Sequence, residues 1–274
     1  MDSIVLLGTG CPSPSHKRFG PSTLVTSGNQ NILIDAGSGV TQRLSEHGLK
    51  PSAIDIILIT HLHSDHIVDL YQLYISGWHS GRTKPFKLVG PRGIEKFFNR
   101  TMEAYDDELS LRIEWEKRPN KGGLEIEIIE INEEFTFDDQ DIKIKSIEVQ
   151  HQPVEPAYGY EFLVKNKKVT YSGDTKYSKN LENASKNAEY LIHEVFVDLN
   201  FDDKRMTQDT LKNVREYHST PEDVGKLAQA ANVKNLVLNH FVPPVFDEEL
   251  LKNEISKYYD GKIIVGRDLD VFNL

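Results

Sequence analysis

The sequence predicts an α/β protein, and three observations support this class. Short apolar runs rich in β-branched residues alternate along the chain with segments whose apolar residues have helical spacing. The run 56–59 is apolar at every position, which favours a strand covered on both faces. At 274 residues the chain exceeds the usual size of one domain. Layered α/β folds reach this length as one unit, so we expect a single domain, 1–274.

Composition and charge limit where the protein works and what it binds. There is no run of eighteen apolar residues and no secretion signal, so we expect no membrane partner. The single cysteine, Cys11, excludes an intrachain disulfide and is typical of a reducing compartment, which predicts a cytoplasmic location. The net charge of −10 opposes long-range attraction to nucleic acid, although a basic patch or bound cations can reverse this locally.

The N-terminal part is expected to begin with three strands and a helix. The strands are 3–7, 22–26 and 31–34, and the helix is 40–47 with Gly48 as its C-cap. The segment 8–12 only superficially resembles a phosphate-binding loop, because it lacks the required third glycine and lysine. In the loop that follows, His16, Lys17 and Arg18 are candidates for substrate contact, with a solvated loop as an interpretation that is at least as good.

The segment Thr60-His61-Leu62-His63-Ser64-Asp65-His66 directly follows the apolar strand 56–59. His61 and His63 are two residues apart and can project to the same side. Asp65 and His66 can turn toward a second point if the chain bends at Ser64. Imidazole and carboxylate groups in this arrangement suit two neighbouring divalent cations and are ligands that zinc favours. The alternative is a solvated histidine-rich loop, for which a strand leading into this cluster gives little structural reason.

More residues of the same kind follow later strands. His151 comes after a strand at 142–149, Asp174 after one at 169–172, Glu194 after one at 190–192, and His240 after one at 236–239. His151 can add a third imidazole to the first metal, and Asp174 can bridge both metals. Metal-type residues at the C-terminal ends of four separate strands rarely arise by chance.

The remaining segments are interpreted as core, turns and surface. Val68, Leu70, Leu73 and Tyr74 have helical spacing and are expected in the core. The glycine-punctuated segment 76–82 carries Trp78, His79 and Arg82, a composition suited to a pocket wall. The other expected elements are strands at 86–89, 124–131, 135–137, 158–164, 263–265 and 271–272, helices at 94–102 and 247–259, a solvated basic loop at 117–121, and a helix starting at Thr220.

The segment Thr60–His66 resembles the H-x-H-x-D-H signature of the metallo-β-lactamase superfamily, and the later residues match its other motifs in order. The resemblance spans nearly the whole chain and implies a four-layer αβ/βα sandwich with the metals at one edge between two sheets. Asp35 is then expected to support the ligands by hydrogen bonds. The resemblance implies two zinc ions, replaceable by manganese or iron, and assigns seven ligands: His61, His63 and His151 to one, Asp65, His66 and His240 to the other, and Asp174 to both.

Within the superfamily, the chain is most similar to the ribonuclease Z and arylsulfatase-like branch. His193-Glu194 and His218-Ser219-Thr220 resemble two ribonuclease Z motifs, in which the second histidine works with the glutamate on the leaving group. The tRNA-gripping arm of ribonuclease Z has no counterpart in the short segment between His151 and Asp174, which argues against tRNA processing. Relatives in this branch commonly pair, which implies a homodimer.

The resemblance implies a binuclear zinc hydrolase, most simply a phosphodiesterase acting on RNA ends or a small phosphodiester through a metal-bridging hydroxide. Asp65 is expected to orient the nucleophile and accept its proton, and His218, positioned by Glu194, to protonate the departing oxygen. A buried structural pair is the alternative for Glu194 and His218. Two other functions stay open: the same site acting on aryl sulfates, lactones or β-lactams, or a metal-binding sensor without turnover.

Overall fold

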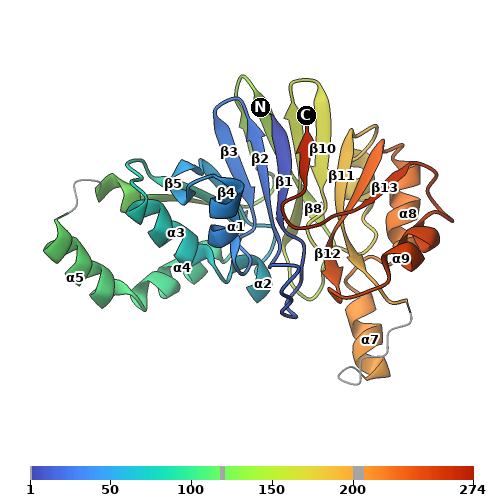
Figure 1. Cartoon of the computed structure of the whole chain (residues 1–274), viewed down its shortest axis with the longest axis horizontal. Helices are drawn as coiled ribbons and strands as arrows, with labels where there is room; N and C mark the ends of the chain where they lie inside the picture. Colours follow the sequence, from blue (N-terminus) through green and yellow to red (C-terminus); the bar gives the residue numbers. More distant parts are fainter. Residues whose placement is uncertain (1, 118–120, 200–206) are drawn as a thin grey trace.

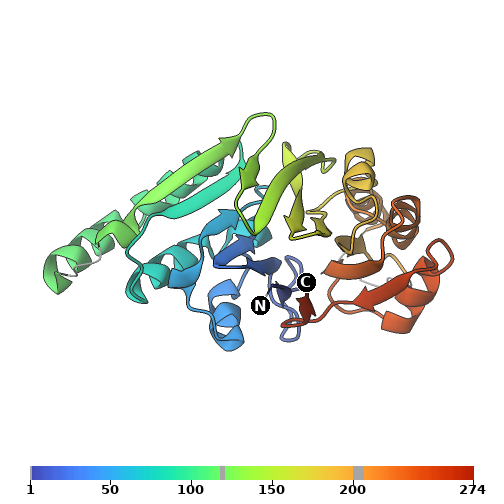
Figure 2. The same cartoon turned by 90° about the horizontal axis from the view of Figure 1, so that it is seen from above.

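The computed structural model of the chain describes residues 2–117, 121–199 and 207–274. Within these residues, two mixed sheets of seven strands each face one another, and helices cover their outer faces (Figures 1 and 2). This arrangement confirms the expected four-layer αβ/βα sandwich. No helix in the described ranges is long and apolar enough to cross a membrane.

The first sheet consists of N-terminal strands and the last strand of the chain. In spatial order its strands are β14 (Val271–Asn273), β1 (Ser3–Gly8), β2 (Ser22–Ser27), β3 (Gln30–Ile34), β4 (Ile56–Leu58), β5 (Phe86–Pro91) and β6 (Ile126–Ile131). Strands β3 to β6 run parallel, so the C-terminal ends of β3 and β4 meet at one edge. Asp35 and the segment from Thr60 to His66 follow these two ends.

The second sheet is built from the C-terminal half. In spatial order its strands are β13 (Lys262–Val265), β12 (Asn235–Val242), β11 (Tyr190–Phe196), β10 (Lys167–Tyr171), β9 (Ala157–Val164), β8 (Ile142–Val149) and β7 (Thr136–Asp138). Strands β10 to β13 run parallel, which brings the segments carrying Asp174, Glu194 and His240 to a common edge. Parallel α/β sheets characteristically place ligand sites at this edge.

The helices follow the same division between the two sheets (Figure 1). Those of the first half are α1 (Val40–His47), α2 (Ser64–Ile67), α3 (Leu70–His79), α4 (Ile94–Glu103) and α5 (Asp106–Glu116), with 3₁₀ turns at Pro51–Ala53 and Lys121–Leu124. Those of the second half are α6 (Lys179–Ala184), α7 (Gln208–Arg215), α8 (Pro221–Ala230) and α9 (Glu248–Ile255).

The packing of strand β4 explains why its sequence is apolar at every position. Ile56 and Leu58 pack in the core between the two sheets, whereas Ile57 and the following Ile59 pack beneath α1 and α3. Because each fully buried aliphatic side chain contributes about 1.5–3 kcal/mol, both faces of this strand stabilise the fold. The strand that leads into the metal-type residues is therefore held rigidly on both sides.

Two predicted helix ends are confirmed in detail. Gly48 has φ of 90°, and its N–H donates to carbonyls in the last turn of α1, which only glycine does at little cost. At α8, the Thr220 side chain accepts from the backbone N–H of Asp223, and the Asp223 side chain accepts from that of Thr220, with Pro221 at the first helical position.

The prediction that segment 76–82 forms a pocket wall is wrong. Helix α3 continues to His79, and Trp78 is only 1% exposed, packed with Ile75 and Leu109. The guanidinium of Arg82 donates to the carbonyls of Ser52, Ile54, Lys84 and Pro85, all of which lie before strands β4 and β5. These residues therefore belong to the opposite end of the sheet from the metal-type residues.

Other expectations need smaller corrections. Val68 is 55% exposed and not in the core, because it lies between α2 and α3. Helix α9 ends at Ile255, earlier than expected, and β11 and β12 continue through Glu194 and His240. Helices α5, α6 and α7 were not predicted. Of the basic run 117–121, Lys117 follows α5 and is exposed, while 118–120 fall outside the described residues.

Candidate metal and catalytic site

The segment after β4 is fixed by one buried carboxylate. Asp35 accepts a hydrogen bond from the backbone N–H of Thr60 at 2.8 Å and from its hydroxyl at 2.9 Å. The Thr60 oxygen lies 3.0 Å from Nδ1 of His61, and Nδ1 of His66 lies 2.8 Å from Asp35 Oδ2. Asp35 therefore orients two histidines at once, one directly and one through Thr60, as the sequence predicted.

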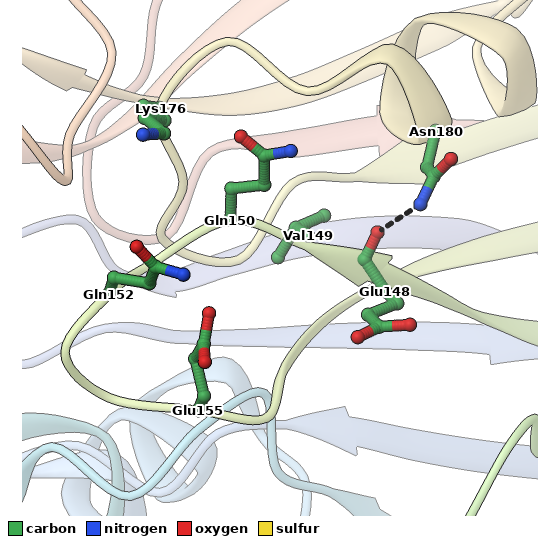
Figure 3. Close-up of a pocket in the computed structure, with 7 residues that line it drawn as sticks. All are labelled: Glu148, Val149, Gln150, Gln152, Glu155, Lys176 and Asn180. Atoms are coloured by element: carbon green, nitrogen blue, oxygen red, sulfur yellow. Dashed lines mark hydrogen bonds between the residues drawn. The ribbon is translucent and has the colours of Figure 1, made fainter.

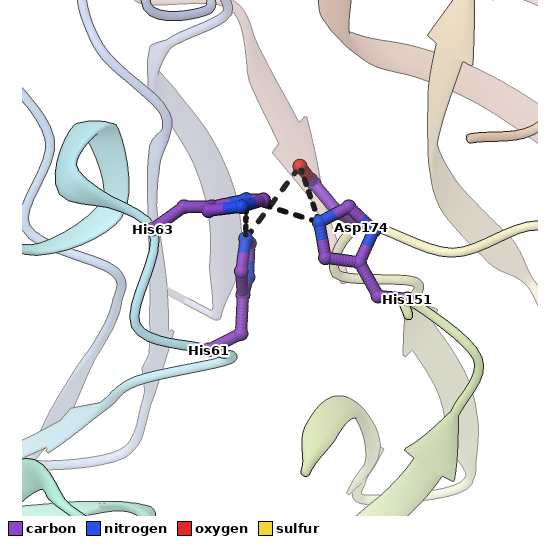
Figure 4. A group of neighbouring side chains, drawn as sticks. All are labelled: His61, His63, His151 and Asp174. Carbon is purple, nitrogen blue, oxygen red and sulfur yellow. Dashed lines mark hydrogen bonds and ion pairs between the residues drawn. The ribbon is translucent and has the colours of Figure 1, made fainter. Parts of the chain in front are cut away.

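The first group of metal-type side chains consists of His61, His63, His151 and Asp174 (Figure 4). Nδ1 of His63 lies 3.0 Å from Nε2 of His61 and 3.0 Å from Nε2 of His151. His61 and His151 are fully buried, and His63 is partly exposed. Three imidazole nitrogens from two different sheets thus converge on one point.

The second group consists of Asp65, His66 and His240. Nε2 of His240 lies 3.2 Å from Nε2 of His66 and 3.3 Å from Oδ2 of Asp65. The short helix α2 makes the predicted bend at Ser64, and it turns Asp65 and His66 away from His61 and His63. His240 is the extra residue of a β-bulge in β12, which differs from the expected strand end.

Asp174 lies between the two groups. Its Oδ2 is 3.4 Å from Nε2 of both His66 and His240, 3.8 Å from that of His61 and 3.9 Å from that of His151. Gly173 places it there with φ of 60°, and a Cβ at this glycine would lie 2.5 Å from the Tyr158 carbonyl oxygen. One carboxylate oxygen is therefore positioned to contact ligands on both sides.

The residues fit a metal ion. Tetrahedral zinc with metal–nitrogen bonds of about 2.0–2.1 Å separates its ligand nitrogens by about 3.3 Å, close to the nitrogen separations in both groups. The second oxygen of Asp174 is buried and has no hydrogen-bond partner among the described residues. The outer nitrogens of His61, His66 and His151 face Thr60, Asp35 and the Tyr217 carbonyl, which leaves the inner nitrogens available as ligands.

The electrostatics of the two groups differ. Burial lowers the pKa of His61 well below its usual value and that of His151 to about 4, so both are in the neutral form that binds metals. Burial also disfavours a charge on His66, but Asp174, Asp35 and Asp65 outweigh it and raise the pKa of His66 well above its usual value. The second group therefore favours a positive charge at its centre, which suits a cation.

His218 and Glu194 form a buried pair beside the metal-type residues. Oε1 of Glu194 lies 2.9 Å from Nδ1 of His218 and also accepts from the backbone N–H groups of Thr175 and Ser219. Nδ1 of His218 lies 4.0 Å from Oδ2 of Asp174. Glu194 is thus held by three donors, and it fixes the orientation of the His218 imidazole.

The segment before α8 also contributes a contact that the sequence did not predict. The carbonyl oxygen of Tyr217 lies 2.8 Å from Nδ1 of His151, and the Tyr217 ring is 4.7 Å from that of His218. A backbone carbonyl leaves no signal in a sequence. The only available sign was that Tyr217 directly precedes the His-Ser-Thr segment.

Two cavities adjoin this site. One, of about 310 Å³, is lined by Asp65, Val68 and the loop from Cys11 to Gly20. The other, of about 520 Å³, is lined by His218 together with Lys176, Arg215 and residues at the start of α8. Asp65 and His218 thus line separate cavities.

A third cavity, of about 350 Å³, lies at the turn after β8 (Figure 3). Gln150, Gln152, Glu155 and Lys176 line it, and Asn180 donates to the Glu148 carbonyl at its rim. Gln150 and Gln152 are exposed, whereas His151 between them is buried in the metal-type cluster. This cavity is therefore separated from the cluster by the chain itself.

Of the loop residues considered for substrate contact, His16 and Lys17 are exposed. Arg18 is 9% exposed, and its guanidinium donates to Thr9 and to the Gly266 carbonyl. The interpretation of Arg18 as part of a solvated loop is wrong, because its charged group is bound inside the protein.

Two adjoining histidine and aspartate clusters at one edge of a four-layer sandwich are the arrangement expected of a metal-dependent hydrolase of the metallo-β-lactamase fold. A family model described as beta-lactamase superfamily domain matches residues 30–241. Ribonuclease Z of Mycobacterium marinum (strain ATCC BAA-535 / M) is 31% identical over 277 residues, covering 98% of this chain and 97% of that protein. Ribonuclease Z of Mycobacterium bovis (strain BCG / Pasteur 1173P2) is 32% identical over 275 residues with the same coverage.

Solved structures show the same fold. The metallo-beta-lactamase fold protein YhfI from Bacillus subtilis matches with a TM-score of 0.76 at 19% identity, and human tRNase Z, short form, with 0.72 at 24%; each match covers 99% of this chain and 98% of the other. The chain belongs to the β-lactamase superfamily and, within it, to the ribonuclease Z-like hydrolases. This family uses divalent metals, and the cluster of histidines and aspartates fits such a site.

Proposed function

We propose that the chain is a phosphodiesterase that binds two zinc ions, one in each group of metal-type side chains, with Asp174 between them. The observation that carries this proposal is the combination of the two ligand groups with the His218–Glu194 pair, which lies within 4.0 Å of Asp174. When bound, the two cations would lower the pKa of a water molecule and neutralise negative charge on the phosphoryl oxygens.

Asp65 is proposed to orient the attacking water and accept its proton. Its Oδ2 lies at the inner side of the second group, 3.3 Å from Nε2 of His240 and 3.6 Å from that of His66. Burial opposes its ionisation, but His66 and His240 lower its pKa below the usual value. The carboxylate is therefore ionised at neutral pH and able to accept a hydrogen bond from water.

His218 is proposed to protonate the departing oxygen. Its Nδ1 is bound to Glu194, which leaves Nε2 as the nitrogen that can deliver a proton to a substrate. Oε1 of Glu194 is contacted by Nδ1 of His218 and by the backbone N–H groups of Thr175 and Ser219, and these contacts keep the pair in one orientation. General acid catalysis of this kind typically contributes about 10²–10⁴-fold in rate.

The proposed substrates are RNA ends or small phosphodiesters. The relatives named ribonuclease Z support RNA, and because each match covers 98% of this chain and 97% of the relative, the short segment between His151 and Asp174 does not separate the chain from them. The net charge of −10 favours a small diester. Since phosphate contacts release counterions, an RNA substrate would bind much more weakly as salt increases, whereas a small diester would change little.

The cellular setting belongs to the same proposal. The single cysteine supports a cytoplasmic protein, and burial raises the pKa of the Cys11 thiol to about 11, which keeps it unreactive at neutral pH. We also propose a homodimer, to be checked by light scattering. Manganese or iron in place of zinc would be identified by elemental analysis of protein purified without added metal.

Two other functions would use the same residues. Aryl sulfates, lactones or β-lactams could be hydrolysed at the same cluster, whereas a metal-binding sensor would have no turnover. A metal-binding sensor has no need for an oriented His218. The buried Glu194, which contacts three N–H groups including that of His218, would then have no function. This pair is what favours an enzyme over a sensor.

The test is turnover of a chromogenic aryl phosphodiester by zinc-loaded protein, compared with the corresponding aryl sulfate and with Asp65→Asn. We expect cleavage of the diester, no cleavage of the sulfate, and loss of diester cleavage in the variant. A protein that binds both metals and leaves the diester intact would refute the phosphodiesterase and direct the search to sulfate, lactone and lactam substrates.

A further inference from the structure

His240 differs from the other buried histidines of the cluster in how it is oriented. His61, His66 and His151 each have an outer ring nitrogen held by Thr60, Asp35 or the Tyr217 carbonyl. Nδ1 of His240 is buried and has no hydrogen-bond partner within the described ranges. Because such contacts normally fix the ring of a metal-binding histidine, something else must orient His240.

The backbone of His240 provides that orientation. His240 is the extra residue of a β-bulge, since Glu194 pairs with Asn239 and Val195 pairs with Phe241. Its φ is 39°, a conformation that residues other than glycine rarely adopt and that the surrounding structure has to maintain. The direction of the His240 side chain therefore depends on how firmly the next residue, Phe241, is held.

Phe241 is held from two sides by the N-terminal loop. Its backbone N–H donates to the carbonyl of Thr9 at 3.1 Å, across from the second sheet to the end of β1. The guanidinium of Arg18 lies 4.2 Å from the centre of the Phe241 ring and donates to the Thr9 hydroxyl at 2.8 Å. Thr9 and Arg18 thus form one unit that fixes both the backbone and the ring of Phe241.

Asp268, in the turn before β14, ties this unit together. Its Oδ1 accepts from the backbone N–H of Thr9 at 2.9 Å and from the Thr9 hydroxyl at 2.7 Å. Its Oδ2 accepts from the backbone N–H of Phe19 at 2.7 Å, which fixes the residue next to Arg18. One carboxylate therefore closes the loop 9–19 at both ends.

We propose that Asp268 is a positioning residue that acts through Thr9 and Arg18 on the His240 bulge. By this route it determines how tightly the second group, Asp65, His66 and His240, binds its cation. The inference rests on the proposed two-metal site. It gives a role to Arg18, Thr9 and Asp268, none of which belongs to either group of metal-type side chains.

The first test is stepwise zinc titration of the metal-free full chain with a competing chelator, for the unaltered protein and for Asp268→Asn. The asparagine keeps the size of the side chain but turns an N–H₂ group toward an N–H donor. We expect the first zinc to bind with unchanged affinity and the second about 10–100-fold more weakly, the usual cost of losing a supporting contact to a ligand. The absorption spectrum of the cobalt-substituted protein should lose the contribution of the second ion.

The matched control is Asp55→Asn. Asp55 is also half-buried and accepts from the backbone N–H of Asn31 and from Lys84, but at the opposite end of β4 from the cluster. Both zinc affinities should stay unchanged in this variant. Thermal unfolding of both variants separates a general loss of stability from a specific loss of the second metal.

A second pair of variants covers the case in which Asp268→Asn does not fold. Thr9→Val removes the hydroxyl shared by Asp268 and Arg18, and Thr9→Ser keeps it. We expect weaker binding of the second zinc in the valine variant and restored binding in the serine variant.

The outcomes separate the two proposals. An unaltered protein that binds only one zinc overturns the two-metal site and the role of Asp268 with it. An unaltered protein that binds two zinc ions, with variants that weaken both steps equally or neither, overturns only the role of Asp268.

Discussion

The two halves of the molecule supply the site in different ways. The first half contributes His61, His63, Asp65 and His66 within six consecutive residues, and one buried carboxylate, Asp35, orients His66 directly and His61 through Thr60. The second half contributes single residues from separate strands, held by a carbonyl, a glycine turn and a bulge. The first set is therefore organised locally, whereas the second depends on the packing of distant strands.

The largest effect is expected where the two halves meet. Asp174→Asn should lower turnover by more than about 10²-fold, because it alters a proposed ligand itself, whereas losing only a supporting contact costs about 10–100-fold. The bound metal, measured by elemental analysis, should fall in the same variant. If Asp174→Asn kept two tightly bound ions and normal turnover, Asp174 would not be a ligand shared by the two metals.

The next effect separates chemistry from metal binding. His218→Ala should keep the metal content and slow cleavage by about 10²–10⁴-fold for diesters with poor leaving groups, because those need a proton on the departing oxygen. Diesters with good leaving groups should be slowed much less. Kinetics with a series of aryl leaving groups measure this, and equal slowing across the series would contradict the acid role.

A smaller effect is expected from the local support of the first half. Asp35→Asn should weaken metal binding by about 10–100-fold, because it disturbs the hydrogen bonds that orient His66 and, through Thr60, His61. Chelator competition measures the affinity. The same change at Asp268 should weaken only the second metal. Identical effects of Asp35→Asn and Asp268→Asn on both metal affinities would contradict the idea that the two halves support the site in different ways.

The smallest effect on activity is expected at Arg82. Arg82→Met should leave turnover unchanged but lower the free energy of unfolding by roughly 2–4 kcal/mol, because buried carbonyls lose a charged donor. Urea denaturation and steady-state kinetics on the same preparation test this. A fall in kcat/KM without a loss of stability would contradict this and support the original prediction that Arg82 contacts the substrate.

Much of the fold could be predicted because β-branched apolar runs and capping residues are local signals. The run 56–59 predicted a doubly covered strand, and Thr220, Pro221 and Asp223 predicted the start of α8. The failures were at 76–82 and at α5 to α7. There, a glycine in α3 and short, mostly polar segments with few buried residues concealed helices.

The sequence by itself determined the composition of the candidate site, because residue types and their order specify which metal-type side chains are present and which strands they follow. Only the tertiary structure decided how they meet. The bulge at His240, the carbonyl of Tyr217 behind His151, and the clamp of Asp268, Thr9 and Arg18 on Phe241 all depend on backbone groups from distant parts of the chain. Backbone groups are the same in every residue, so their partners emerge only when the two sheets pack together.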